Sequence, residues 1–184
     1  MPTLHEIFSW VCGQQNNWLV GGGELPFCQR CTGLYVGAIP ALLLCLYFRP
    51  KATRRMLWVH GMLLLLMVPF GYHLVPQTAV IRMLTGQLFA IGLVYYLVLL
   101  GFDRWEGWRA LTRIEEVAYF LIAGCTLLLS QMAVRWGGRE AYTILSLMGV
   151  GGLLVYVALV AGSLVLLGEA FWKVLRGRVR QAES

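Results

Sequence analysis

The chain has 184 residues, of which 59% are hydrophobic and only 13% are charged. Soluble domains carry about 25% charged residues, so this composition excludes an ordinary soluble protein and indicates one that lies mostly in a lipid bilayer. The net charge of +6 does not indicate a nucleic-acid partner, because basic loops beside anionic lipid account for it, and the expected partner is membrane lipid.

The N-terminal segment begins with the pattern of a short helix. Thr3 and Glu6 have the spacing of a capping box, and apolar residues recur at helical intervals from Leu4 to Val11. We expect this helix to lie along the membrane surface. A loop rich in glycine and amide residues is expected to follow over residues 13–23.

Three cysteines belong to the same segment: Cys12 and the Cys-x-x-Cys pair of Cys28 and Cys31. This spacing lets two sulfurs converge on one metal ion or on each other. His5 precedes Cys12 by seven residues and would lie on the same side of a helix. Three thiolates and this imidazole are a ligand set for zinc or iron. A structural disulfide, a structural metal and a reactive pair of Cys28 and Cys31 all stay open.

Five apolar runs follow, each near the length of about 20 residues that a helix needs to cross a bilayer. Backbone amides in lipid must be paired within their own segment, and the alternation of a membrane β-barrel is absent, so the runs are predicted to be helices. The expected fold is all-α, a polytopic membrane bundle of about five transmembrane helices beside the short interfacial helix. The predicted spans are 32–48, 56–76, 83–102, 117–134 and 142–168.

Lysine and arginine are unevenly distributed over alternating sides of these spans. Eleven of the fifteen fall in the connections 49–55 and 104–113 and in the tail 169–184, and four fall on the other side. Because cytoplasmic loops carry the excess of basic residues, we expect the N-terminus outside and the C-terminus in the cytoplasm of a plasma (inner) membrane. The expected parts are an outward cysteine-containing segment 1–31, a bundle 32–168 and a basic cytoplasmic tail 169–184.

Ionisable groups are rare inside the predicted spans and include no acid, which disfavours a proton-coupled pump. His73 lies near the outer end of the second span, and Arg82 lies at the outer mouth of the third. Together with Arg30, they form a candidate site for an anion or an anionic lipid. Interfacial snorkelling of the arginines and a hydrogen bond from His73 to a neighbouring helix would explain the same residues structurally.

Two stretches resemble the motifs of a known family. Residues 28–37 read Cys-Gln-Arg-Cys-Thr-Gly-Leu-Tyr-Val-Gly, and residues 81–86 read Ile-Arg-Met-Leu-Thr-Gly. Preceded by Cys12, they resemble the signature Cys-His…Cys-x-Arg-Cys-Thr-Gly-x-Tyr-x-Gly and the motif Leu-Arg-x-x-Thr-Gly of a domain-of-unknown-function family of small prokaryotic multi-pass membrane proteins. Gly13 stands where that family has His. The resemblance covers about the first half of the chain and implies a membrane location and a cysteine site, without a reaction.

Neither a phosphate-binding loop nor a nucleophile elbow occurs in the sequence, so enzymatic activity is left open. The favoured hypothesis is a structural or accessory protein, with other membrane subunits as partners, whose cysteine site holds a disulfide or a metal. One alternative is a membrane thiol-redox enzyme that uses Cys28 and Cys31. The other is a protein that binds or transports anionic lipid or anions.

Overall fold

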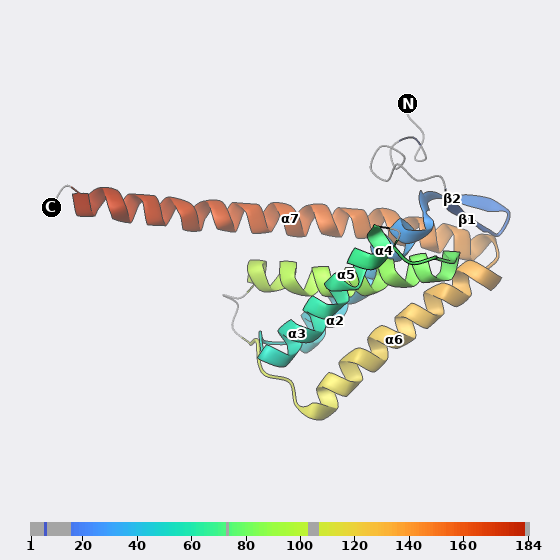
Figure 1. Cartoon of the computed structure of the whole chain (residues 1–184), viewed down its shortest axis with the longest axis horizontal. Helices are drawn as coiled ribbons and strands as arrows, with labels where there is room; N and C mark the ends of the chain where they lie inside the picture. The colour runs from blue at the N-terminus through green and yellow to red at the C-terminus, as the bar shows by residue number, and fades with distance from the viewer. Residues whose placement is uncertain (1–5, 7–15, 73, 103–106, 183–184) are drawn as a thin grey trace.

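In the computed structural model the chain is a bundle of helices with one β-hairpin (Figure 1). The structure describes residues 6, 16–72, 74–102 and 107–182. The predicted interfacial helix, with His5 and Cys12, lies outside these residues, and so does His73. In chain order the elements are β1 (Asn17–Val20), β2 (Gly23–Cys28), α2 (Gln29–Phe48), α3 (Arg54–Leu65), α4 (Met67–Gly71), α5 (Ala79–Phe102), α6 (Arg113–Trp136) and α7 (Arg139–Ala182).

Four helices in the described part of the chain are long and apolar enough to cross a membrane, namely α2, α5, α6 and α7. The predicted all-α membrane bundle is thereby confirmed. The second predicted span, 56–76, differs because it is divided at Leu66 into α3 and α4. Pro69 explains the division, since it has no N–H for the carbonyl of Leu65 and its ring crowds that carbonyl. This segment is therefore a broken pair of helices.

The glycine-rich stretch that was predicted to be a loop contains a β-hairpin instead. Strand β1 pairs with β2 in antiparallel fashion, with Val20 opposite Gly23. Between them, Gly21 and Gly22 have φ angles of 55° and 81°. A type I′ turn needs positive φ at both central residues, which glycine adopts at little cost. The sequence analysis recognised the turn-forming glycines but missed the strands on either side.

Helices α2 and α5 run parallel and are in backbone contact near their N-termini. A Cβ atom added at Gly33 would lie 2.0 Å from the carbonyl oxygen of Met83, and one added at Gly86 would lie 2.2 Å from that of Arg30. Only glycine permits such an approach, as is typical of tight helix pairs in membranes. The N-terminal turns of the two helices therefore pack directly against each other.

Helix α7 is much longer than its neighbours and packs only its first half on the bundle. Phe27 of the hairpin lies against Gly149, and the backbone of Tyr35 in α2 lies against Gly152. Beyond this contact α7 continues through residues 169–182 and extends away from the other helices (Figure 1). Helix α6 diverges from α7 after their shared connection (Figure 1).

The bundle has two distinct ends. At the hairpin end lie the β-hairpin, the first turns of α2 and α5, and the α6–α7 connection, where Gly138 contacts Gly21. At the opposite end, the connections after α2 and before α6 lie side by side, and the backbone N–H of Arg109 donates to the carbonyl of Arg49 over 3.2 Å. Glu115 and Glu116 of α6 form ion pairs there with Arg109 and Arg55.

Candidate functional site

The Cys-x-x-Cys pair lies where β2 passes into α2. Cys28 is the N-cap residue of α2, and its buried Sγ accepts a hydrogen bond from the backbone N–H of Cys31 over 3.4 Å. The sulfur thus takes the role that a serine or aspartate oxygen usually has at a helix start. Within the described residues no disulfide joins Cys28 to Cys31.

The predicted metal site is only partly covered by the structure. Cys28 and Cys31 lie together, whereas His5 and Cys12 lie outside the described residues. In the described part of the chain no group of three or more metal-ligating side chains is formed. The four-residue ligand set therefore stays a prediction.

Arg30, in the first turn of α2, reaches the segment that joins α4 to α5. Its Nη2 donates hydrogen bonds to the carbonyl oxygen of Phe70 and to Oε1 of Gln77, both at 2.7 Å. The Phe70 carbonyl is available because α4 ends at the next residue. The Nε of Arg30 is buried and has no hydrogen-bond partner in the part of the chain that the structure describes.

Arg82 lies in the first turn of α5, which begins one turn earlier than predicted. Thr78 marks this start, because its Oγ1 accepts a hydrogen bond from the N–H of Ile81 over 3.4 Å. The Nη1 of Arg82 donates to Oε1 of Gln29 at the long distance of 3.5 Å. Its Nε, like that of Arg30, is buried without a hydrogen-bond partner in residues 6, 16–72, 74–102 and 107–182.

The two arginines share one end of the bundle and an electropositive environment. Gly86, one turn after Arg82, touches the backbone of Arg30, so the arginines belong to contacting turns. The N-termini of two parallel helices add partial positive charge there. Among the described residues neither guanidinium forms an ion pair, because the two ion pairs lie at the opposite end. Unpaired guanidinium groups beside helix N-termini have the chemistry that suits an anion.

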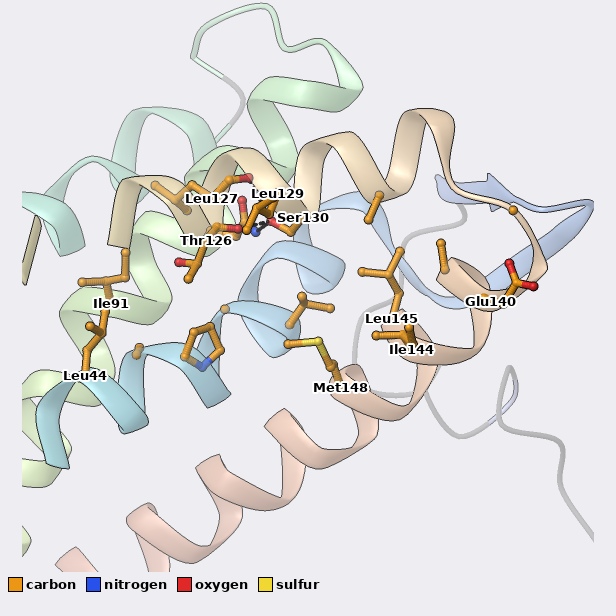
Figure 2. Close-up of a pocket in the computed structure, with 18 residues that line it drawn as sticks. Leu44, Ile91, Thr126, Leu127, Leu129, Ser130, Glu140, Ile144, Leu145 and Met148 are labelled. Carbon is orange, nitrogen blue, oxygen red and sulfur yellow. Dashed lines mark hydrogen bonds between the residues drawn. The ribbon is translucent and has the colours of Figure 1, made fainter. Parts of the chain in front are cut away.

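A separate cavity of about 500 Å³ lies between α2, α5, α6 and α7. Figure 2 shows its lining, in which aliphatic side chains predominate. Its place between α6 and α7 is not legible in the sequence, since the hollow lies where these two helices diverge (Figure 1). Polar lining groups include Gln87, Thr126 and Ser130, and the Nε2 of Gln87 donates to Oγ of Ser130.

A buried polar cluster near the opposite end also escaped the sequence analysis. His60 Nδ1 lies 2.9 Å from the carbonyl oxygen of Met56; since a carbonyl only accepts, Nδ1 carries the proton and Nε2 accepts from the hydroxyl of Tyr119 at 3.1 Å. The Tyr119 oxygen lies 3.8 Å from Sγ of Cys45, and the ring of Tyr95 stacks on His60. Four helices meet in this cluster, which we interpret as structural.

Comparison with known families gives a match over residues 12–96 to a family described as predicted membrane protein (DUF2085). The matched stretch contains the Cys-x-x-Cys pair, both arginines and α2, whereas α6 and α7 lie outside it. The match agrees with the resemblance to a domain-of-unknown-function family of membrane proteins. No curated protein and no solved structure gives a match. With its four candidate spans, the chain is a multi-pass membrane protein.

Proposed function

We propose that this multi-pass membrane protein binds the phosphate group of an anionic membrane lipid at its hairpin end, through Arg30 and Arg82. One observation carries the proposal: each arginine has a buried Nε that finds no hydrogen-bond partner among the described residues, on turns that touch. A buried donor that lacks an acceptor costs free energy. Because both side chains are only half-buried, a phosphate at this end can bind the guanidinium groups and, with a small shift of each side chain, remove this cost at both residues.

A lipid phosphate has the chemistry that two such arginines select. The guanidinium group presents several N–H donors in a planar fork that matches the oxygens of a phosphate. Helix N-termini favour the same ligand, because their unpaired N–H groups and dipole point toward it. The absence of an ion-paired carboxylate at Arg30 and Arg82, among the described residues, leaves both charges available to the ligand.

Snorkelling is the competing explanation for arginines at the ends of membrane helices. A snorkelling side chain extends toward the headgroups so that its polar atoms are solvated. Here Arg30 turns inward, to the Phe70 carbonyl and to Gln77, and the Nε of each arginine is buried. These side chains are therefore held as parts of a site, which supports binding over simple anchoring.

The proposal includes an orientation. We infer that the hairpin end faces outward in the plasma membrane, so that the bound lipid belongs to the outer leaflet. The basic connections and the basic end of α7 support this, because they lie on the other side and fit the cytoplasmic surface.

The test is to count bound lipid on purified Arg30→Ala and Arg82→Ala proteins. Each protein is reconstituted in vesicles of phosphatidylcholine with phosphatidylglycerol, re-extracted in mild detergent and examined by native mass spectrometry. We expect both variants to lose most of the retained phosphatidylglycerol. The matched control is Arg135→Ala, an exposed arginine near the same end of the bundle, which should retain it.

Circular dichroism and gel filtration establish that each variant is folded before its lipid is counted. Arg30→Lys keeps the charge but not the planar fork, so it should retain less phosphatidylglycerol than the wild type and more than Arg30→Ala. Equal retention by wild type, Arg30→Ala and Arg82→Ala would exclude the site.

A second candidate function is a structural or accessory subunit in which the cysteine site orders the N-terminal segment. The position of Cys28 favours it, since this sulfur forms the N-cap of α2 and lies one helical turn from Cys31. Cys12 and His5 would complete a metal site, and zinc or iron fits such ligands.

Metal content and thiol state decide this second candidate. About one zinc or iron per chain, lost in Cys28→Ser and unaffected in Cys125→Ser, would support a metal site. A metal-free protein with a disulfide between Cys28 and Cys31 that exchanges with mild thiols would support the thiol-redox alternative. Elemental mass spectrometry and alkylation on one sample give both readings, and Cys125 is the control because it is exposed in α6.

A further inference from the structure

The cavity between α2, α5, α6 and α7 lies among the four helices that are able to cross a membrane. Its volume of about 500 Å³ is within the range of roughly 300–1,000 Å³ found for ligand pockets. Neither Arg30 nor Arg82 lines it. The cavity is therefore a feature separate from the proposed anion site.

The cavity has a closed floor and an open side. Leu44, Ile91 and Leu145 line it and are only 6%, 5% and 2% exposed. By contrast, Leu129 of α6 and Ile144 of α7 line it while remaining 64% and 56% exposed. The opening thus lies between α6 and α7, the two helices that diverge (Figure 1). In a membrane this side faces lipid tails.

The cavity wall has few free hydrogen-bonding groups for water. Gln87 donates to Ser130 and accepts from Nε2 of Gln131 at 3.5 Å, and Ser130 donates to the carbonyl of Thr126 at 2.9 Å. The lining groups Gln87 and Ser130 thus have partners within the protein, whereas a buried water needs about two to four polar partners of its own. Among the described residues that line the cavity, Glu140 is the one charged residue. Its side chain is exposed at the hairpin end (Figure 2).

From these features we propose that the cavity binds one acyl chain of a bilayer phospholipid, which enters sideways between α6 and α7. An apolar hollow that is open to lipid is filled by hydrocarbon, because an empty one forfeits the dispersion contacts of its lining. The chain lies along the buried floor, which Leu44 and Ile91 form at one end of the cavity and Leu145 at the other (Figure 2), and the exposed Leu129 and Ile144 flank its entry.

Photo-crosslinking tests this proposal directly. The full chain is reconstituted in vesicles of phosphatidylcholine that contain a small share of phosphatidylcholine with a diazirine on one acyl chain. After irradiation, adducts are located by peptide mass spectrometry. The zwitterionic lipid is chosen so that the result does not depend on the proposed anion site, and Arg30→Ala should give the same adducts.

We expect adducts on Leu44, Ile91 and Leu145, which the protein shields from bulk lipid. Val94 and Val98 are the internal controls, because they are fully buried in α5 and do not line the cavity. Adducts on the cavity floor at least fivefold above those on the two valines would support occupation. Equal labelling of floor and controls would overturn the proposal.

Two variants of α6 sharpen the result. Ala133→Phe places a ring at a lining position and should reduce the floor adducts at least fivefold. Leu128→Phe adds similar bulk on the same helix at an exposed position that does not line the cavity, and it should leave them unchanged. Floor adducts that persist in a folded Ala133→Phe protein would also contradict the proposal. If Ala133→Phe does not fold, the wild-type ratio of floor to valine adducts decides alone.

Discussion

Single side chains join helices of this bundle that are far apart in the sequence. The hydroxyl of Tyr119 in α6 contacts His60 in α3 and Cys45 in α2, and all three side chains are fully buried. The proton on His60 Nδ1 fixes the direction of the hydrogen bond from Tyr119. Losing one member therefore leaves a buried polar atom without its partner.

Replacement of Tyr119 by phenylalanine removes only the hydroxyl and leaves Nε2 of His60 buried without a donor. We expect the free energy of unfolding in detergent to fall by about 1–3 kcal/mol, the usual cost of such an unsatisfied group. Unfolding by denaturing detergent, followed by circular dichroism, measures the change. Tyr47→Phe is the matched control, because Tyr47 is 81% exposed; equal stability of the two variants would contradict this role for Tyr119.

At the scale of residues, the sequence identifies the charged residues of the candidate site but not their contacts. Arg30 and Arg82 stood out as cations at the ends of apolar runs. Their contacts did not, because the Phe70 carbonyl that binds Arg30 is 40 positions away and is available only where α4 ends. His60 was visible as a polar group in an apolar run, but nothing local pointed to Tyr119.

At the scale of elements, the packing of α2 on α5 depends on glycine. Gly33 and Gly37 have the Gly-x-x-x-Gly spacing that is typical of close helix contacts in membranes, and in the structure Gly33 faces the backbone of Met83. Gly86 is its counterpart in α5, facing Arg30. Since these contacts involve backbone atoms, no side-chain movement relieves a clash there.

Gly86→Ala should therefore separate the two helices. We expect a loss of about 1–3 kcal/mol of stability, as for overpacked cores, and weaker phosphatidylglycerol binding because the turn of Arg30 is displaced. Gly124→Ala in α6 is the matched control: nothing lies within 4 Å of its added Cβ, and alanine has the better helix propensity. Thermal unfolding in detergent compares them, and a Gly86→Ala protein as stable as Gly124→Ala would refute the tight contact.

Helix positions were the most predictable elements. The runs 32–48 and 83–102 correspond to Gln29–Phe48 and Ala79–Phe102, because length and hydrophobicity determine a membrane helix almost alone. The run 56–76 is also long and apolar, yet Pro69 divides it. Hydrophobicity averaged over about 20 residues is hardly changed by one proline, although this proline lacks the N–H that a continuous helix needs. The short strands of the hairpin lack the alternation of apolar and polar residues that would have marked them.

On the scale of the whole molecule, basic residues are divided between the two ends of the bundle. The hairpin end holds Arg30 and Arg82, and the opposite end holds the paired connections with Arg49, Arg55 and Arg109. An excess of basic residues marks the cytoplasmic side. The inferred orientation places the hairpin and the cysteine pair outside.

Reporter fusions test this orientation in a bacterial host. Alkaline phosphatase, which is active only outside the cytoplasm, should be inactive after Ser184 and active after Gly137, where α6 reaches the hairpin end. A fluorescent protein that matures only in the cytoplasm should give the reverse pattern. The opposite activities would invert the topology and place the anion site in the inner leaflet.

Helix α7 is long enough to extend well beyond the bilayer. Its 44 residues correspond to about 66 Å, against a hydrocarbon thickness of about 30 Å. The Cζ of Arg176 lies over the ring of Trp172, 5.0 Å from its centroid, near the point where the apolar span ends. A tryptophan and an arginine are typical of the membrane surface. The helix continues without a break to Ala182, so a change in the tilt of α7 within the bilayer would, in the inferred orientation, swing its basic end across the cytoplasmic surface.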